Sequence, residues 1–178
     1  KAVRALCAEQ PILMVSGCSA CVYPKPMLSV ALAQGRDAKA VISESGENAA
    51  RRLNVRLLAE TWVSGIDAPR HRLRTTRGDF RYAQLVLALG ATPAPLPLDA
   101  ESNQHLWRIN HIDHYARFRA VIGGSPKRIA IIGAGLVGCE LADDLAGAGH
   151  NLTLIDTASQ PLPGLASPDT AQSLTQAL

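Results

Sequence analysis

The feature that most constrains this chain is a strand-like run, Arg128-Ile-Ala-Ile-Ile132, that leads directly into a cluster of glycines. Its continuous apolar character predicts a central strand of a parallel sheet. A helix is predicted over 136–148 and a second strand over 151–155. In this strand, turn, helix and strand context, a glycine cluster predicts a dinucleotide-binding unit. The three glycines are Gly133, Gly135 and Gly138.

Each glycine of this turn has its own expected role. Gly133 permits the tight turn, Gly135 lets a pyrophosphate approach the backbone, and Gly138 lets the helix pack closely on the strand. The helix N-terminus supplies amides and partial positive charge for the phosphates. Leu136 and Val137, which lie between the last two glycines, complete the predicted cofactor-binding turn.

Two acids accompany the turn. Asp156 ends the second strand, 18 residues after Gly138. A carboxylate there accepts hydrogen bonds from both ribose hydroxyls and repels a 2′-phosphate, which favours NAD over NADP; the alternative is that Asp156 caps a turn. Glu140 either complements the helix dipole, worth about 0.3 to 1 kcal/mol, or faces a nicotinamide ring and helps to orient it. The sequence leaves both roles of Glu140 open.

Composition excludes several classes of protein. With 178 residues, 47% hydrophobic and 19% charged, the chain can bury a core as one domain or two small ones. A net charge of +3 and 4% aromatic residues give no reason to expect nucleic acid as a partner. The apolar run 11–15 is too short for a signal peptide, and no run is long enough to span a membrane. We therefore expect a cytoplasmic protein with reduced thiols.

Other segments predict further secondary structure. Helices are predicted over 28–34 and 45–53, and small antiparallel strands between 55 and 75. A strand over 85–89 ends at Gly90, and the proline-rich stretch after it predicts a domain crossing. Another helix is predicted to begin after a cap at Asn110 and to bury one face. That face consists of Ile112, Tyr115, Phe118 and Ile122.

Five segments, in register, carry a resemblance to a known family. The segments are 23–29 (YPKPMLS), 61–67 (TWVSGID), 85–91 (LVLALGA), 115–119 (YARFR) and 133–140 (GAGLVGCE). Only the glycine motif is specific by itself; the five in order are specific together. On these segments the chain resembles the rubredoxin-NAD reductase branch of the FAD-dependent pyridine nucleotide-disulfide oxidoreductases.

This resemblance implies an α/β fold with two Rossmann-like dinucleotide-binding domains, both incomplete, and a small antiparallel β-meander in the first. Residues 1–108 would form a partial FAD-binding domain and residues 109–178 a partial NAD-binding domain. The family's own opening glycine motif and its closing ribityl-binding motif and interface domain lie outside this sequence, so we expect an internal portion of a longer protein. Cys18 stands where the family has an acid for the adenosine ribose.

The resemblance also implies a reaction. NADH would reduce FAD by hydride transfer, and the flavin would pass single electrons to rubredoxin or a similar small iron protein, with no membrane involved. Lys25 would lie beside the isoalloxazine and stabilise the reduced ring, with Pro26 packed near it; Lys25 and Glu140 are the predicted catalytic residues. The backbone of Val63 would contact the adenine, and Leu89 and Gly90 would lie along the FAD.

Several alternatives stay open. The chain can be a non-catalytic NAD-binding module, or a ferredoxin or flavorubredoxin reductase of the same family. Cys18 and Cys21 can form a redox dithiol or half of a zinc site, although adventitious thiols explain them more simply. A surface helix with its cap likewise explains His111, Asp113 and His114 without a metal, and we expect none.

Overall fold

The computed structural model describes residues 2–177, which fall into two compact units. The first unit takes in Lys1–Tyr23 and Ile42–Ala91. The second takes in Pro24–Val41 and Thr92–Leu178. The segment Pro24–Val41, called the strap below, therefore leaves the first unit and packs with the second. No described helix is long and apolar enough to cross a membrane.

The first unit contains a short parallel strand pair. Strand β1 (Leu13–Val15) pairs with β2 (Arg56–Leu58), after the short helix α1 (Ala2–Leu6). Helix α3 (Gly46–Arg52) precedes β2, and the hydroxyl of Ser45 accepts a hydrogen bond from the Asn48 amide at 3.2 Å as its N-cap. The helix predicted over 45–53 is thus confirmed, because a capping serine fixes its start.

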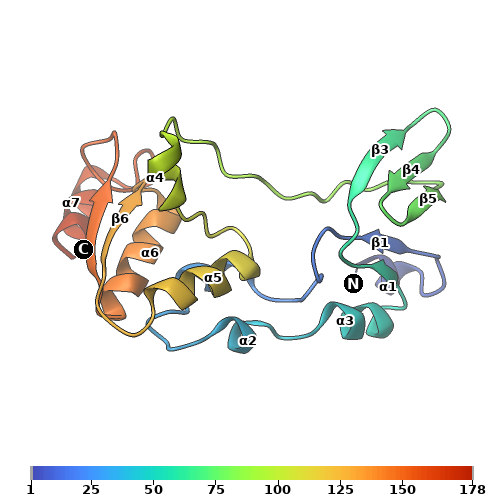
Figure 1. Ribbon diagram of the computed structural model, residues 1–178, viewed down its shortest axis with the longest axis horizontal. Coiled ribbons are helices and arrows are strands. Elements are labelled where there is room, and N and C mark those ends of the chain that lie inside the picture. Colours follow the sequence, from blue (N-terminus) through green and yellow to red (C-terminus); the bar gives the residue numbers. More distant parts are fainter. Residues whose placement is uncertain (1, 178) are drawn as a thin grey trace. The chain divides into compact units, whose positions relative to one another are not determined.

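Three further strands of this unit form an antiparallel sheet in chain order (Figure 1). They are β3 (Val63–Asp67), β4 (Arg72–Thr75) and β5 (Gly78–Arg81). Leu73 is buried, and its register partners are Ile66 and Phe80. One face of the sheet thus gathers its apolar side chains, as the period of two requires.

The strand predicted over 85–89 does not form, and this prediction was wrong. The segment has no regular structure, and Val86, Leu87 and Leu89 are exposed. An extended apolar run becomes a strand only where a neighbouring strand supplies partners for its amides and carbonyls. Among the described residues, β1 and β2 pair only with each other.

The second unit is built around a strand, helix and strand. Strand β6 (Arg128–Ile132) pairs in parallel with β7 (Asn151–Ile155), and helix α6 (Leu136–Gly147) connects them. Both strands have the predicted bounds. However, β6 was predicted to be a central strand, and in the described chain it pairs with β7 alone. Exposure alternates along both strands, because one face of the pair packs against the core of the unit and the other face does not.

Helix α5 (Ile112–Ile122) supplies the core of this unit. Its predicted apolar face is confirmed, because all four predicted residues are buried. Phe118 and Ile122 cluster with Leu145 of α6, and the two strands pack their partly buried side chains against this cluster. The predicted cap was one residue early: the imidazole of His111, rather than Asn110, accepts the amide of Asp113 at 3.3 Å. The unit also contains α4 (Ala100–Gln104) and α7 (Pro168–Ala177).

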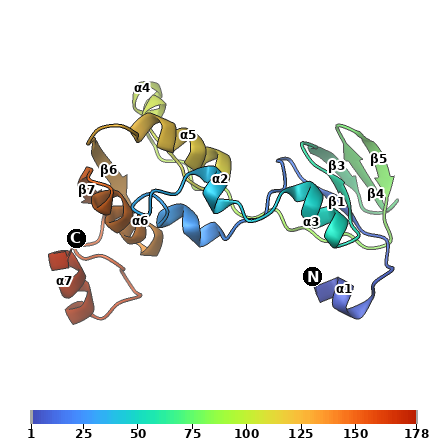
Figure 2. The same ribbon diagram turned by 90° about the horizontal axis from the view of Figure 1, so that it is seen from below.

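The strap contains a 3-10 turn and one short helix instead of the helix predicted over 28–34. The turn is η1 (Lys25–Ser29) and the helix is α2 (Ala38–Val41). Figure 2 shows the strap running beside α5 and α6, with which it is in contact. The prediction failed because the carboxylate of Asp144 on α6 accepts the amides of Leu32 and Ala33, which a helix would have used for its own hydrogen bonds. The predicted division at residue 108 also differs from the two units, which group the strap with 92–178.

Candidate dinucleotide-binding site

The glycine turn between β6 and α6 has a backbone that other residues would disturb. Gly133 has a φ of +108°, a conformation that L side chains rarely adopt. Its amide donates to the carbonyl of Ile155 at 2.8 Å, which ties the turn to the end of β7. A Cβ at Gly138 would lie 1.9 Å from the Gly133 carbonyl oxygen. The tight turn and the close helix packing both depend on glycine.

The N-terminus of α6 is open. Gly135 is its N-cap residue, with no side-chain cap and no acid in the first turn. A Cβ placed on Gly135 would meet nothing within 4 Å. The first amides of a helix lack partners within it, and the helix dipole places partial positive charge there. The turn therefore offers the donors and the free space that a pyrophosphate needs.

Asp156 follows β7 and bonds back to the turn. Its Oδ2 accepts the amide of Ala134 at 2.6 Å, and its Oδ1 accepts the amide of Ala158 at 2.8 Å. These backbone donors, Ala158 first and then Ala134, lower the pKa of the Asp156 carboxyl. The predicted ribose acceptor is thus ionised at neutral pH and also has the turn-capping role that the sequence left as its alternative.

A hollow of about 510 Å³ lies beside Asp156, between α6, β7 and α7. The loop after β7 forms part of its wall, and Leu162 of that loop donates its amide to Ala134 at 2.8 Å. Around the turn, four large apolar side chains are about half exposed. They are Ile132, Leu136, Val137 and Ile155, at 52%, 57%, 58% and 48%. Open α/β sheets bind ligands at this place, outside the carboxyl ends of their strands.

Glu140 lies two residues beyond Gly138 and contacts the strap. Its Oε2 accepts a hydrogen bond from the hydroxyl of Ser29 at 2.6 Å. Ser29 ends η1, whose first two residues are Lys25 and Pro26, and the side chain of Lys25 is exposed. The structure thereby brings the two predicted catalytic residues, 115 positions apart, into one compact unit.

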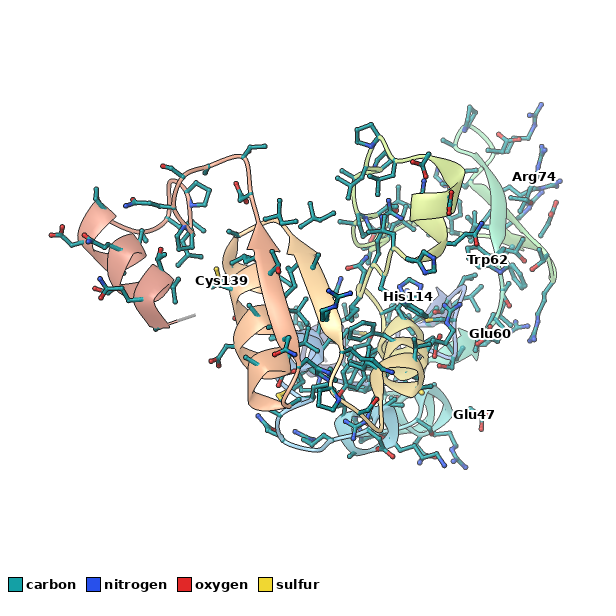
Figure 3. All side chains as sticks on the ribbon, turned by 60° about the vertical axis from the view of Figure 1, so that its left-hand side comes forward. Glu47, Glu60, Trp62, Arg74, His114 and Cys139 are labelled. Carbon is teal, nitrogen blue, oxygen red and sulfur yellow. The ribbon has the colours of Figure 1, made fainter. Side chains whose placement is uncertain are left out.

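The other predicted flavin contacts lie in the first unit. Val63 begins β3 and is 43% exposed, next to the exposed indole of Trp62 (Figure 3). The loop after β1 joins this region, because Glu60 donates its amide to Cys18 and Thr61 donates to Ser16. Leu89 and Gly90 lie in the irregular segment that follows the meander strands, and Gly90 has a φ of +69°.

The cysteines and histidines form no metal centre among the described residues. All four cysteines are free thiols. The Sγ of Cys18 lies 3.2 Å from the Ser16 hydroxyl, and the Sγ of Cys21 accepts the Ser19 hydroxyl at 3.3 Å. Cys139, labelled on α6 in Figure 3, is buried, and burial raises the pKa of its thiol.

Two residues of the site were not predicted from the sequence. Ser29 and Asp144 are both buried and both join the strap to α6. One signal was available: Glu140 and Asp144 are four residues apart and so share a helix face. A buried acid on such a face needs hydrogen-bond donors, and those donors come from a segment more than 110 positions away.

Comparison with known proteins identifies related chains. The nitric oxide reductase FlRd-NAD(+) reductase of Aeromonas hydrophila is 40% identical over 178 residues, which is 100% of this chain and 45% of that protein. The rubredoxin-NAD(+) reductase of Alcanivorax borkumensis is 33% identical over the same span, 46% of its length. The covalent putidaredoxin reductase-putidaredoxin complex matches with a TM-score of 0.84 and 26% identity, over 98% of this chain and 43% of that one.

The family assignment follows from both kinds of evidence. The chain spans less than half the length of these curated relatives. Its glycine turn, the uncapped N-terminus of α6 and the aspartate after β7 lie together on an α/β framework. The profile of the pyridine nucleotide-disulphide oxidoreductases matches residues 1–178. The chain therefore belongs to the pyridine nucleotide-disulphide oxidoreductase family.

Proposed function

We propose that this chain forms the cofactor-binding part of an FAD-dependent NADH oxidoreductase that delivers single electrons to a small iron protein of the rubredoxin type. Its two Rossmann-like portions would be residues 1–108 for FAD and residues 109–178 for NAD, with the meander strands in the first. The observation that carries the proposal is the glycine turn, whose open helix end and ionised aspartate suit a dinucleotide without a 2′-phosphate.

The residues around the turn divide the work of holding NAD. Gly133, Gly135 and Gly138 shape the turn, and the amides that open α6, including those of Leu136 and Val137, face the phosphates. Asp156 accepts hydrogen bonds from the ribose hydroxyls through lone pairs that its two backbone donors leave free. Glu140 touches the nicotinamide half. A lone carboxylate at Asp156 would repel a 2′-phosphate, so the preferred cofactor is NADH.

The residues proposed for FAD are those that the resemblance implies. Lys25 presents a cation from a turn stiffened by prolines on both sides, and its side chain is exposed to receive a ring. Pro26 would pack near the ring, Val63 would contact the adenine through its backbone, and Leu89 and Gly90 would lie along the FAD. When bound, a flavin can accept two electrons from a nicotinamide and release them one at a time.

The electron acceptor is inferred from the relatives. Two of them are named for rubredoxin and for FlRd, and a third is seen joined to putidaredoxin. We propose a rubredoxin, or the rubredoxin-like part of a larger acceptor, because the relative of 40% identity is a FlRd-NAD(+) reductase. A ferredoxin is the second candidate, favoured by the putidaredoxin complex.

The test is an absorbance spectrum of the purified protein before and after the anaerobic addition of FAD, and then of NADH. We expect flavin bands that bleach with NADH and far more slowly with NADPH. Rubredoxin and ferredoxin added to the reduced protein should then be compared as acceptors. A colourless protein that takes up no FAD but still binds NADH would instead establish a non-catalytic NAD-binding module.

A further inference from the structure

The hydroxyl of Ser29 makes a contact that nothing in its local sequence requires. Ser29 is 5% exposed, and its Oγ lies 2.6 Å from Oε2 of Glu140, 111 positions away. The same oxygen lies 2.9 Å from the carbonyl of Pro26. A hydroxyl has one hydrogen to donate, and the shorter distance marks the carboxylate as its acceptor. The Glu140 carboxylate is therefore held in one orientation by the strap.

The strap does not need this hydrogen bond to stay in place. Asp144, one turn further along α6, accepts the amides of Leu32 and Ala33 at 2.9 and 2.8 Å. Gly147 continues the same face, where a Cβ would lie 3.1 Å from that of Ala33. Four, then three, residues separate Glu140, Asp144 and Gly147, so one helix face receives the strap.

Helix α5 holds the following part of the strap. The hydroxyl of Tyr115 donates to the Arg36 carbonyl at 2.6 Å. Arg119, one turn later, donates to the same carbonyl and also to that of Gly35, the latter at 3.0 Å. With Asp144, these contacts anchor the strap at several points beyond η1. Loss of the Ser29 hydroxyl should accordingly release Glu140 and leave the strap docked.

We propose that Ser29 is a positioning residue, which fixes the carboxylate of Glu140 so that it meets the nicotinamide half of bound NADH. The inference rests on the proposed function, because Glu140 acts only if the turn holds NADH. Glutamate has three side-chain torsions to fix, and an acid that must orient a ring works best when its rotamer is already chosen. Ser29 makes that choice from the same turn that presents Lys25.

The test is a double-mutant cycle in the flavin-loaded protein with Ser29→Ala, Glu140→Ala and their combination. We expect Ser29→Ala to lower the limiting rate of flavin reduction by NADH about tenfold, as the loss of a hydrogen bond to a charged group predicts. In the Glu140→Ala background the same change should have almost no effect, because the oxygen that accepts the Ser29 hydroxyl is gone. Additive effects of the two substitutions would overturn the proposal.

A second measurement does not depend on turnover. Calorimetric titration of the oxidised protein with NAD⁺ should show weaker binding for Ser29→Ala, by about threefold, and the same cycle should again be non-additive. Ser29→Thr, which keeps the hydroxyl, should restore both values. Ser173→Ala is the matched control, since its hydroxyl donates to the Asp169 carbonyl on the exposed helix α7, and it should behave like the unmodified protein.

The outcomes separate this inference from the function beneath it. If the unmodified protein takes up no flavin, or its flavin is not bleached by NADH, the proposed function fails. If bleaching proceeds but Ser29→Ala matches the unmodified protein in rate and NAD⁺ affinity, the positioning role fails alone. A fall in thermal midpoint with unchanged rate and affinity would likewise assign Ser29 to structure only.

Discussion

At the scale of single residues, Asp156 serves the turn before any ligand arrives. Its two carboxylate oxygens accept the amides of Ala134 and Ala158, one on each side of the site. The bond to Ala134 holds the glycine turn against the end of β7. The proposed ribose acceptor therefore also shapes the backbone of the glycine turn. Substitutions that remove its charge have to be compared with substitutions that remove its hydrogen bonds.

Cofactor choice tests the charge of Asp156. Asp156→Asn keeps an oxygen for the Ala134 amide but loses the negative charge, and Asp156→Ala with Thr157→Arg adds a cation for a 2′-phosphate. We expect the preference for NADH over NADPH to narrow about tenfold in the first variant and to reverse in the second. Dissociation constants for NADH and NADPH, obtained by titration, measure this preference. Asp169→Ala, on exposed α7, is the control, and an unchanged preference would remove Asp156 from ribose recognition.

The hydrogen bonds of Asp156 are tested by lowering the pH. Because its backbone donors lower the pKa of this carboxyl below the unfolded value of about 3.9, ionised Asp156 stabilises the fold above that value. The contribution is lost as the pH falls through the lower, folded pKa. Asp156→Asn should therefore lose less stability than the unmodified protein between neutral pH and this acid window. Denaturant unfolding across the pH range measures it; parallel curves would contradict the assignment.

At the scale of elements, the strap shows what local sequence can and cannot predict. The bounds of β6 and β7 and the buried face of α5 followed from the sequence, because period and turn residues are local signals. The strap did not. Residues 28–34 have the composition of a helix, but Asp144 takes the amides of Leu32 and Ala33, and Tyr115 and Arg119 take carbonyls just beyond. These competing partners are invisible to a short window.

Asp144 should therefore contribute more to the stability of the fold than its neighbour Asp143 does. Asp144→Ala leaves two strap amides without an acceptor and should lower the free energy of unfolding by about 2 kcal/mol. Asp143→Ala, one position earlier on the exposed side of α6, is the matched control and should change it by less than about 0.5 kcal/mol. Chemical denaturation compares the two. Equal losses would show that the strap is held mainly by α5.

Asp144 has a pKa raised by burial, and the amides of Ala33 and Leu32 only partly offset this. A raised folded pKa means that stability from the protonated form is lost as the pH rises through it. The sign is opposite to that of Asp156. The two aspartates therefore affect stability in opposite directions as the pH changes, although both accept backbone amides. Burial is the largest influence on the pKa of Asp144, whereas the backbone donors are the largest influence on the pKa of Asp156.

At the scale of the whole molecule, the sequence resemblance identified the family, whereas no motif predicted that the strap packs with residues 92–178. A boundary after residue 108 followed from the order of motifs. The compact units instead combine segments that are distant in the sequence, since the strap packs with residues 92–178. The order of motifs describes the chain in one dimension only. The packing of residues 24–41 against two later helices depends on the three-dimensional fold.

This exchange makes the chain a natural candidate for fragment complementation. The backbone passes between the units three times, at 23/24, 41/42 and 91/92. The exposed stretch 92–97, with prolines at 93, 95 and 97, is only one of these passages. If it were cut, residues 1–91 would still carry the strap, and α5 and α6 would still hold it through Asp144, Tyr115 and Arg119. We expect the two fragments to elute together in size-exclusion chromatography, and Asp144→Ala to weaken their association. The covalent link at 92–97 would then connect the two fragments without being needed to hold them together.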